Sequence, residues 1–411
     1  MSGTPAEIIR DPLWDNIRIE PDAMACVETP AVQRLRYVRQ LGHAFLVYPG
    51  ATHSRFEHAL GAYHLARRAL AMLDDRGDLQ AVDDDERLAV RLAALLHDIG
   101  HYPFSHALEE AGFPDHEGLG AERLAAGELG DVLRALGGVT LISRIAALIQ
   151  GRSTSPLAGL VSGSLDLDKI DYLSRDARMC GVPYGLVDVD RLLASLVLVD
   201  GGDEPAEIGV HEKGVSALES LLFAKYQMYR NVYWHHAVRS ATCMFKRAVR
   251  ATVAAGALDA SDIADATDDM LIAALLAGDP SGLGRALRDR RLFKRALDIS
   301  ASEVPDHRLE WIAHDPERVA AAEDRLAAEL ALPTHGVLID YPARASMLSV
   351  DLPLLTRSGA IERLTDEGRT GHLGLPRVAD TLYRSARRLR IFTAEPRRLD
   401  AVPGWLLSAE R

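Results

Sequence analysis

Residues 86–106 read Glu86-Arg-Leu-Ala-Val-Arg-Leu-Ala-Ala-Leu-Leu-His-Asp-Ile-Gly-His-Tyr-Pro-Phe-Ser-His106. Apolar side chains recur in this stretch at intervals of three and four, at Leu88, Leu92, Leu95 and Ile99. That spacing is typical of an amphipathic helix with one face turned to a core, and Gly100 follows as a stop. We therefore expect a helix over 86–99 that leaves His97 and Asp98 at its C-terminal end.

The end of this helix gathers ligand-type side chains, namely His97, Asp98, His101 and His106. His97 and Asp98 supply one imidazole nitrogen and one carboxylate oxygen, a mixture that suits Mn, Fe, Zn or Mg. Two ligands do not hold a catalytic metal, so further ligands must come from elsewhere in the chain. The candidates are His58, at the end of Ser54-Arg-Phe-Glu-His58, and Asp168, which lies in 164–176.

The stretch around Asp168 carries a polar stripe at helical spacing, made of Asp168, Asp171 or Tyr172, and Arg175. Apolar side chains face the other way, at Ile170, Leu173 and Ala177. A helix with one polar and one apolar face suits the wall of a cleft. The alternative is an exposed face that carries salt bridges.

The composition excludes several classes of protein. The chain has 411 residues, of which 48% are hydrophobic and 26% charged, as in globular domains. A net charge of −12 argues against general binding to nucleic acid or to an anionic membrane. The cysteines lie far apart, at Cys26, Cys180 and Cys243, which argues against a disulfide framework. Since we find neither a signal peptide nor an apolar run long enough to span a bilayer, we expect a cytoplasmic protein.

The pattern along the chain changes at about residue 260. Before it, the sequence predicts almost only helices; besides 86–99 they cover 29–41, 54–73, 120–136, 141–150 and 213–255. After it come further helix and two strand candidates, 336–342 and 390–394. We expect an α-helical domain over 1–260 and a C-terminal helical and mixed α/β region over 261–411.

Three motifs in chain order carry a resemblance to a known family: Ser54-Arg-Phe-Glu-His58, His97-Asp-Ile-Gly-His101 and Asp166-Leu-Asp-Lys-Ile-Asp-Tyr172. They resemble the HD-domain phosphohydrolases, and within these the deoxynucleoside triphosphate (dNTP) triphosphohydrolases. Shorter matches are Asp11-Pro12, 28–36, Gln40-Leu-Gly42, Tyr48-Pro-Gly50 and Pro103-Phe-Ser-His106. The resemblance covers about residues 7–250. It implies an all-α HD-domain core with a small C-terminal α/β subdomain.

The resemblance also implies a metal centre. Its ligands would be His58, His97, Asp98 and Asp168, and the ion would be divalent: Mn, Fe, Mg, Zn, Co or Ni. Such an ion lowers the pKa of a bound water and neutralises charge on the α-phosphorus, so that in-line attack releases a deoxynucleoside and inorganic triphosphate. His106 would be the general acid, His101 would line the scissile phosphate, and His116 with Glu117 would orient the attacking water.

Substrate contacts follow from the resemblance as well. Phosphate contacts would come from Arg55, Lys169, Tyr172 and Lys225. Gln40 and Asp176 would hold the sugar 3′-hydroxyl, and Leu41 would crowd a 2′-hydroxyl. A row of side chains spaced four apart, Lys225, Tyr229 and Tyr233, would present one charge and two phenols to a triphosphate. Core packing is the other reading of that row.

Departures from the family pattern bear on its partners. Glu7 stands where the animal relatives carry an effector-site lysine, and Glu28 replaces a shorter aspartate that reads guanine. Trp234 stands in place of a glutamine near the base, and Lys225 in place of an arginine that would bind phosphate in a bidentate fashion. We therefore expect no GTP-style activation, although another nucleotide effector stays possible. We expect a nucleotide substrate and a homo-oligomer, either dimer or tetramer, with no membrane or nucleic-acid partner.

The expected function is metal-dependent hydrolysis of dNTPs to deoxynucleoside and triphosphate. Two alternatives remain. A phosphodiesterase or phosphatase on another nucleotide would use the same centre, since the metal requires only a phosphoester. A non-catalytic nucleotide-sensing protein is the second alternative, and the intact His-His-Asp-Asp set argues against it.

Overall fold

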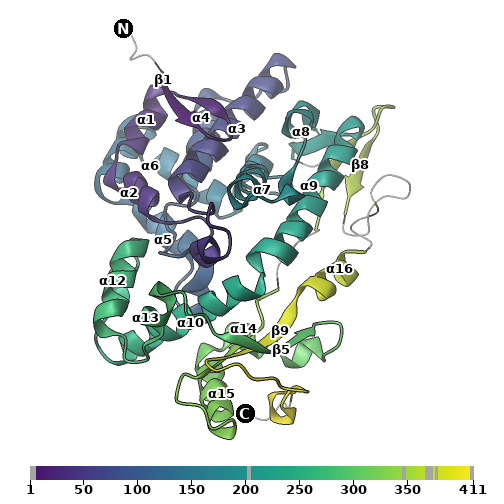
Figure 1. Cartoon of the computed structure of the whole chain (residues 1–411). Helices are drawn as coiled ribbons and strands as arrows, with labels where there is room; N and C mark the ends of the chain where they lie inside the picture. Colours follow the sequence, from purple (N-terminus) through teal and green to yellow (C-terminus); the bar gives the residue numbers. More distant parts are fainter. Residues whose placement is uncertain (1–5, 201–204, 345–348, 366–373, 375–377, 408–411) are drawn as a thin grey trace.

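Three helices form the centre of the helical core in the computed structural model: α3 (Arg55–Asp75), α4 (Asp84–Leu96) and α7 (Leu167–Cys180) (Figure 1). The structure describes residues 6–200, 205–344, 349–365, 374 and 378–407. α3 packs against both α4 and α7. Each helix begins at a cap written in the sequence: the side chains of Asp83 and Asp166 accept backbone N–H groups, and Ser54 forms a capping box with Glu57.

The other helices surround this centre. Their bounds are α1 Pro21–Val27, α2 Pro30–Gln33, α5 His116–Ala125, α6 Gly127–Ile149, α8 Val189–Ser195, α9 Val215–Met228, α10 His236–Ala254, α11 Ala260–Ile263, α12 Asp268–Gly278, α13 Leu283–Arg288, α14 Trp311–His314, α15 Pro316–Glu329 and α16 Ala379–Ala386. The helix expected over 213–255 is divided, because a π-helical turn, Tyr229–Tyr233, separates α9 from α10. The helix expected over 29–41 is shorter, since α2 passes into a 3₁₀ turn over Arg34–Tyr37.

Strands also occur within the first 260 residues, where the sequence predicted almost only helices. β1 (Glu7–Asp11) and β2 (Asp15–Ile19) form an antiparallel hairpin. β3 (Leu196–Val199) and β4 (Glu207–His211) begin a second sheet, which β7 (Leu352–Leu355) and β8 (Ile361–Leu364) complete in the order β3-β4-β7-β8. The pair β4 and β7 is parallel, with Val210 opposite Leu354. Residues from both sides of position 260 therefore share one sheet.

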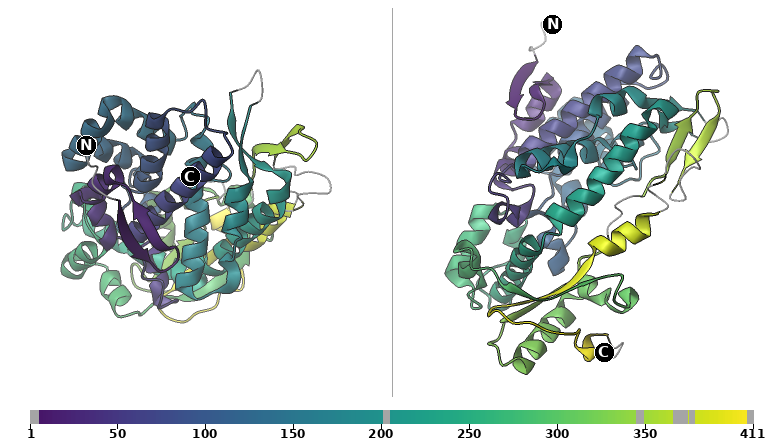
Figure 2. Two further views of the ribbon diagram at one scale, coloured as in Figure 1. Left: turned by 90° about the horizontal axis from the view of Figure 1, so that it is seen from above. Right: turned by 45° about the vertical axis from the view of Figure 1, so that its right-hand side comes forward.

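A small α/β subdomain stands at the other end of the molecule, as expected from the sequence. β5 (Lys294–Ser300), β9 (Arg388–Thr393) and β6 (Val337–Asp340) form an antiparallel sheet with β9 in the middle. The two strand candidates, 336–342 and 390–394, correspond to β6 and β9. α14 and α15 pack on β6, and α9 with α10 runs from the helical core towards this sheet (Figures 1 and 2).

Helix α6 tests the expectation that the chain does not cross a membrane. Among the described helices it alone has the length and apolarity of a membrane span, and 28% of the apolar window is buried. Its backbone is broken at Gly137 and Gly138, where Gly138 has φ 68° and ψ −166°. Its buried side chains pack against α4 and α5. One such helix, interrupted and packed on a core, is weak evidence for a membrane span.

Candidate metal centre and active site

The four predicted ligands come together from three helices. His58 comes from α3, Asp168 from the first turn of α7, and His97 is the C-cap of α4, followed by Asp98. α4 ends three residues earlier than the 86–99 expected, at Leu96, so both ligands leave the helix rather than lie along it. Because α3 packs against α4 and α7, the helix packing itself places these side chains side by side.

Their donor atoms are spaced as metal ligands are. The Nε2 atom of His58 lies 3.1 Å from Nε2 of His97 and 2.9 Å from Oδ1 of Asp168, and the last two atoms are 3.5 Å apart. Ligand atoms bound at about 2.1 Å from one ion lie about 3 to 3.4 Å apart. Asp98 Oδ1 lies 3.4 Å from His97 Nε2. The donor set therefore fits a divalent cation, with Asp98 at its edge.

Buried contacts select which nitrogen of each histidine faces the centre. Nδ1 of His58 lies 2.7 Å from Oδ2 of Asp171, and Nδ1 of His97 lies 3.0 Å from the carbonyl oxygen of Ala94. A carboxylate or carbonyl can only accept, so each ring in its neutral form carries its proton on Nδ1 and leaves Nε2 free to bind a metal. Nδ1 contacts of this kind orient the imidazoles of many metal sites.

Asp171 is itself fixed by a chain of charged partners. Its carboxylate accepts hydrogen bonds from Trp14 Nε1 at 2.5 Å and from the Arg175 guanidinium at 2.9 and 3.0 Å. Arg175 in turn pairs with Asp11 at 2.8 Å; Asp11, Asp171 and Arg175 are buried, and Trp14 is half-buried. The sequence had shown Asp171 and Arg175 only as members of a polar stripe. The contacts of Asp11 and Trp14 were not expected, although Asp11-Pro12 belongs to a matching motif.

The ion-free centre has strongly shifted pKa values. Burial disfavours the charged form of His58, yet hydrogen bonds to Asp168 and Asp171 outweigh it and raise its pKa to about 10. The pKa of Asp168 is lowered, because His58 and His97 outweigh the opposing effect of burial. The Arg55 guanidinium, paired with Asp98, overcomes the same effect and lowers the pKa of Asp98. Without a metal, the protonated His58 ring supplies positive charge to these carboxylates. A bound divalent cation would replace that proton.

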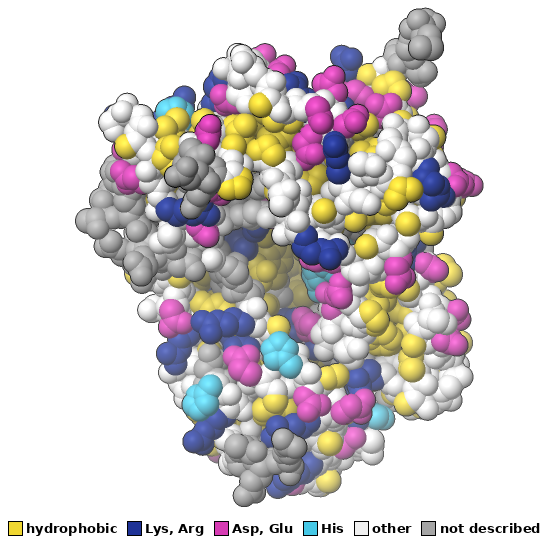
Figure 3. Space-filling view, turned by 180° about the vertical axis from the view of Figure 1, so that it is seen from behind, with side chains coloured by type: hydrophobic (Ala, Val, Ile, Leu, Met, Phe, Trp, Pro, Cys, Tyr) yellow, Lys and Arg dark blue, Asp and Glu magenta, His cyan; other side chains and the backbone are white. Residues whose placement is uncertain are grey.

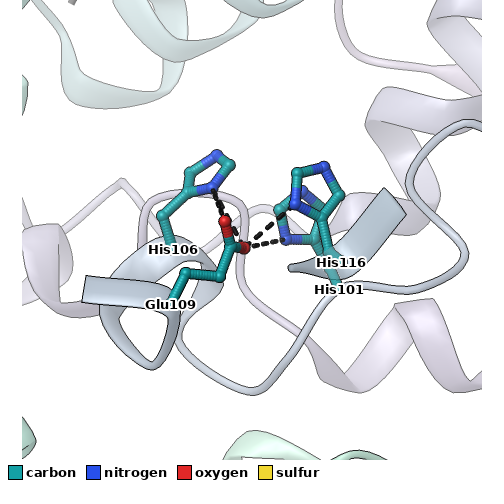
Figure 4. A group of neighbouring side chains, drawn as sticks. All are labelled: His101, His106, Glu109 and His116. Atoms are coloured by element: carbon teal, nitrogen blue, oxygen red, sulfur yellow. Dashed lines mark hydrogen bonds and ion pairs between the residues drawn. The ribbon is translucent and has the colours of Figure 1, made fainter. Parts of the chain in front are cut away.

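A second group of side chains lies beside Asp98, made of His101, His106, Glu109 and His116 (Figure 4). The imidazoles of His101 and His116 are stacked, with ring centroids 3.8 Å apart. Glu109 Oε1 lies 3.0 Å from His116 Nδ1 and 3.3 Å from His106 Nδ1. The carboxylate that contacts His116 is thus Glu109 and not the neighbouring Glu117, which is exposed. Glu109 lies three residues after His106, and this helical spacing is a sequence signal that could have identified it.

The backbone before His106 is strained. Phe104 and Ser105 both adopt the left-handed region, with φ 58° and 62°, which side chains rarely occupy. The ring of Phe104 stacks on the buried His43 at 4.3 Å, and the Ser105 hydroxyl contacts the carbonyl oxygens of Arg39 and Gln40 at 2.9 and 2.7 Å. These contacts hold the turn that carries His106. Strain of this kind is concentrated at functional sites.

A cavity of about 590 Å³ opens onto both groups. Its walls include most of the predicted site residues: His97, Asp98, Asp168, His101, His106, His116, Glu117, Gln40, Leu41, Arg55, Tyr172, Asp176, Tyr229 and Tyr233. The face of the molecule shown in Figure 3 is hollowed near its middle, with histidine and acidic side chains at the rim. The structure thus brings almost all of the predicted residues to one space.

Lys169 and Lys225 are the predicted phosphate contacts that are not among the residues lining this cavity. The Lys169 ammonium group donates to the carbonyl oxygen of Gly163 at 2.8 Å and pairs with Asp166. Lys225 is buried, and the loss of water lowers its pKa to about 8. The row of Lys225, Tyr229 and Tyr233 is not one continuous α-helical face, because the π turn intervenes. π turns of this kind are frequent at functional sites.

Asp176 and Gln40 differ in how they are held. The Asp176 carboxylate contacts His53 Nε2 and accepts the Tyr233 hydroxyl, both at 2.7 Å. The side-chain oxygen of Gln40 is buried without a hydrogen-bond partner in the described part of the chain. A buried acceptor without a donor is costly, and a ligand hydroxyl would satisfy it.

Comparison with protein families agrees with this geometry. The HD domain model matches residues 55–176, and the model of the HD associated region matches residues 187–368. The first match contains all four convergent ligands. The chain belongs to the HD-domain phosphohydrolase family. HD domains bind divalent metal ions, and the His/Asp group described above could hold one in this chain. This HD-domain protein is accordingly a metal-dependent hydrolase.

Several relatives resemble this HD-domain protein along most of its core. It is 32% identical over 325 residues to an uncharacterized protein of Methanocaldococcus jannaschii, covering 79% of this chain and 67% of the relative. It is 35% identical over 241 residues to uncharacterized protein YwfO of Bacillus subtilis, covering 57% and 53%. It is 30% identical over 264 residues to deoxynucleoside triphosphate triphosphohydrolase SAMHD1 of Bos taurus, covering 56% and 44%. The chain thus matches only about half of the last two relatives.

Solved structures share the whole architecture. A phosphohydrolase from Bacteroides thetaiotaomicron superposes with a TM-score of 0.74 at 24% identity, covering 95% of this chain and 100% of that one. A hypothetical protein from Aquifex aeolicus superposes with a TM-score of 0.70 at 26% identity, covering 95% and 96%. The helical core and the C-terminal subdomain therefore recur together in this family.

Proposed function

We propose that this chain hydrolyses dNTPs to deoxynucleosides and inorganic triphosphate. One observation carries the proposal: three of the four predicted metal ligands, His97, Asp98 and Asp168, border a cavity of about 590 Å³ that His101, His106 and His116 also line. A nucleotide needs a space of this size, and phosphoester hydrolysis needs a cation and proton-transfer groups within it. The similarity to deoxynucleoside triphosphate triphosphohydrolase SAMHD1 supports the choice of substrate.

A bound divalent cation supplies charge neutralisation at the phosphate and a water molecule of lowered pKa. The side chains of this chain provide the remaining steps. His106 is 60% exposed towards the solvent side of the cluster, so it can receive a proton from water and pass it to the leaving 5′ oxygen. Glu109 holds the His116 ring by its Nδ1 atom, which leaves Nε2 to accept a hydrogen bond from the attacking water.

The nucleoside end of the cavity offers a basis for selecting deoxyribose. Gln40 presents its partnerless side-chain oxygen to a sugar hydroxyl. Leu41 lies beside it in the cavity wall and leaves little room for a 2′-hydroxyl. Asp176, held by His53 and Tyr233, has a fixed carboxylate for the 3′-hydroxyl. A polar site built for one hydroxyl rejects analogues by leaving buried groups unpaired.

Product chromatography tests the proposal. Each dNTP and each rNTP is incubated with Mn²⁺, Mg²⁺, Fe²⁺ or Co²⁺, and nucleosides and polyphosphates are separated. We expect deoxynucleoside with triphosphate from the wild type and none from the double variant His97→Ala with Asp98→Ala. His314→Ala, an exposed histidine of α14, is the matched control. Release of monophosphate with pyrophosphate would refute the assignment of the cleaved bond.

A phosphodiesterase or phosphatase acting on a different nucleotide is the second candidate. This candidate is favoured because neither Lys169 nor Lys225 lines the cavity. Without these two lysines the cavity walls offer less positive charge to a triphosphate than to a phosphate group of lower charge. Turnover of a nucleoside monophosphate or a cyclic dinucleotide, with no product from any dNTP, would select this candidate. Binding of nucleotides without any turnover would instead indicate a sensing protein.

The proposal extends to assembly and location. We propose a homo-oligomeric enzyme of the cytoplasm, with manganese first among the ions to test. Light scattering on the purified protein, with and without dNTP, measures the assembly, and a monomer under both conditions would refute it.

A further inference from the structure

Helix α10 lies between the loop that carries the cavity histidines and the small α/β subdomain. It contacts the 3₁₀ turns Ser105–Ala107 and Glu109–Ala111 of that loop, and it also contacts strand β6. Four cationic side chains of the helix are spaced three, four and seven apart, so they lie on one face: Arg239, Lys246, Arg247 and Arg250. This basic face of α10 meets acidic groups from both the loop and the subdomain.

The guanidinium of Arg239 joins the loop to the subdomain. Its Nη1 and Nη2 atoms donate to Oε1 and Oε2 of Glu110 at 2.9 and 2.8 Å. Its Nε and Nη2 atoms donate to Oδ1 of Asp340, the last residue of β6, at 3.1 and 2.7 Å. Arg239 and Asp340 are buried, and Glu110 is half-buried. A guanidinium fork can hold two carboxylates in fixed positions, and an ammonium group, as a point charge, cannot reproduce this geometry.

The loop end of this bridge is next to the carboxylate that orients two cavity histidines. Glu109 and Glu110 belong to the same 3₁₀ turn. Glu109 Oε1 lies 3.0 Å from Nδ1 of His116 and 3.3 Å from Nδ1 of His106 (Figure 4). A shift of the turn would therefore move the Glu109 carboxylate and both imidazoles with it.

Arg250 makes a second connection between the same two parts of the molecule. Its Nη1 atom donates to the carbonyl oxygen of Ala111, at the end of the turn, at 3.0 Å. Its Nη2 atom pairs with Glu317 of α15, which is exposed. The buried contacts of Arg239 are the stronger connection, because water weakens an exposed pair.

Arg247 lies on the same face of α10 and offers a contrast. Its Nη2 atom donates to both carboxylate oxygens of Asp324 at 2.7 Å, and its Nε atom donates to Nδ1 of His335 at 2.8 Å. Its Nη1 atom lies 3.5 Å from Glu323. These partners all belong to the subdomain. Arg247 thus attaches α10 to the subdomain through contacts that do not include the loop.

We propose that Arg239 is a positioning residue for the cavity histidines. By connecting Glu110 to Asp340, it fixes the turn that carries Glu109, and through Glu109 it fixes the rings of His106 and His116. Arg239 and Asp340 lie within the HD associated region, whereas Glu110 lies within the HD domain. The HD associated region therefore takes part in building the site. The effect on turnover rests on the proposed function, and the effect on the two imidazoles does not.

Histidine NMR on the whole protein tests the inference without any turnover. The chain is labelled with isotopes at histidine and kept in Mg²⁺, which is diamagnetic, and signals are assigned from His106→Gln, His116→Gln and His335→Gln. We expect the imidazole signals of His106 and His116 to move in Arg239→Lys and to stay in place in Arg247→Lys. The signal of His335 should move in Arg247→Lys alone, because Arg247 donates to that ring.

Steady-state kinetics give the second measurement. If dNTPs are the substrates, Arg239→Lys should lower kcat on the order of a hundredfold with KM nearly unchanged, because a small misplacement of a reacting group has an effect of this size. Arg247→Lys should change neither constant. Arg239 also lines the cavity. A higher KM at unchanged kcat would show that it binds the substrate directly, and would overturn the positioning role.

The remaining outcomes separate the inference from the proposed function. Signals of His106 and His116 that stay in place in Arg239→Lys, or that move equally in Arg247→Lys, would overturn the inference. Thermal unfolding checks that both variants are folded; if Arg239→Lys is not, Asp340→Asn, which keeps the size of the side chain, replaces it with the same signals expected to move. Shifted imidazole signals in the variant, with no dNTP hydrolysis by the wild type, would refute the proposed function and leave the positioning role standing.

Discussion

The buried Asp171 carboxylate, which is not one of the predicted metal ligands, determines which nitrogen of His58 can bind a metal. Asp171 fixes the proton of His58 on Nδ1, and Trp14 and Arg175 fix Asp171. Arg175 and Asp171 are buried, so a substitution of Arg175 would leave the Asp171 carboxylate without a donor that water could easily replace. The metal-binding nitrogen is therefore selected by residues from the N-terminal hairpin region and from α7, at one remove from the ion.

Gly61 leaves the space in which this carboxylate sits. A Cβ atom at position 61 would lie 1.9 Å from Oδ1 of Asp171 and 2.5 Å from Nη2 of Arg175. We expect Gly61→Ala to lower the free energy of unfolding by about 1–3 kcal/mol, as overpacking does, and to weaken binding of a metal ion at the predicted His/Asp centre. Denaturant unfolding and cobalt titration measure the two effects. Gly404→Ala, whose new methyl group meets no atom within 4 Å, is the control and should change neither.

Arg344 lines the cavity, and its contacts with the described residues are weak. Its guanidinium lies 3.7 Å from the exposed Asp380 and 5.4 Å from the Tyr383 ring centre. Exposed pairs of this type contribute little, so the side chain can turn to a phosphate. If dNTPs are the substrates, Arg344→Ala should raise KM about tenfold, the effect of one charged hydrogen bond. Steady-state kinetics measure it. Arg325→Ala, on α15 and away from the cavity, should leave KM unchanged.

At the scale of single elements, two irregular helices shape the molecule. α6 turns at Gly137 and Gly138, and the chain between α9 and α10 makes a π turn over Tyr229–Tyr233. The π turn carries Tyr229 and Tyr233 into the cavity wall, with their rings 5.1 Å apart. In both places the departure from regular helix geometry redirects side chains that a straight helix would point elsewhere.

The bend of α6 depends on backbone freedom rather than on space. Gly138 has φ 68° and ψ −166°, a conformation open essentially to glycine, and a Cβ atom there would meet nothing within 4 Å. Gly138→Ala should therefore cost about 1–3 kcal/mol of unfolding free energy through strain alone. Thermal and denaturant unfolding would show the loss. An unchanged stability would mean that the bend can relax, and Gly118→Ala in α5, at ordinary φ, serves as reference.

The sequence predicts some of these elements and not others, for physical reasons. Capping side chains and apolar periodicity are local signals, so α3, α4 and α7 could be placed to within a few residues. The π turn leaves no such signal, because apolar and aromatic residues continue through 229–233 at nearly helical spacing. β3 and β4 were missed for another reason: they are short, and the pairing of β4 with β7 depends on residues more than 140 positions away.

Whole-molecule geometry explains which site predictions could be made. The ligand set follows from motifs that α3, α4 and α7 carry, and helix packing brings those motifs together. The resemblance paired His116 with Glu117, whereas in the fold the carboxylate that contacts His116 is Glu109. Arg344 could not be assigned at all, since only the subdomain's position against the core brings it to the cavity.

A buried glutamate between α15, β6 and α10 makes stability depend on pH. Glu323 accepts the backbone N–H of Ile339 at 2.9 Å and lies 3.5 Å from Nη1 of Arg247. Burial raises its pKa from 4.5 to about 7, against the opposing effects of the backbone hydrogen bond, Arg247 and Lys246 and with a small contribution from Asp324. Between these two pH values the folded chain binds the extra proton, and the unfolded chain has released it.

We therefore expect stability to fall as pH rises through this interval. The free energy of unfolding should drop by up to about 3 kcal/mol from pH 4.5 to 7.5, relative to Glu323→Gln. Urea unfolding at several pH values measures the difference between the two proteins. Asp324→Asn, at the half-exposed neighbouring position, should retain the wild-type slope. Parallel pH profiles for wild type and Glu323→Gln would show that Glu323 has the same pKa in the folded and the unfolded chain, and would contradict the prediction.

The pairing of β4 with β7 sets an order for events on the ribosome. Val210 and His211 can pair only after Leu354 and Leu355 have been synthesised. Residues of the same late segment, Val350, Leu352 and Leu354, belong to the apolar cluster of the helical core. A nascent chain that has emerged only to position 260 carries all four predicted metal ligands, yet the edge of β4 that pairs with β7 is still exposed. Chaperones that shield strand edges can therefore bind the exposed edge of β4 during this interval. The interval ends when residue 364 leaves the ribosomal exit tunnel and β8 completes the sheet.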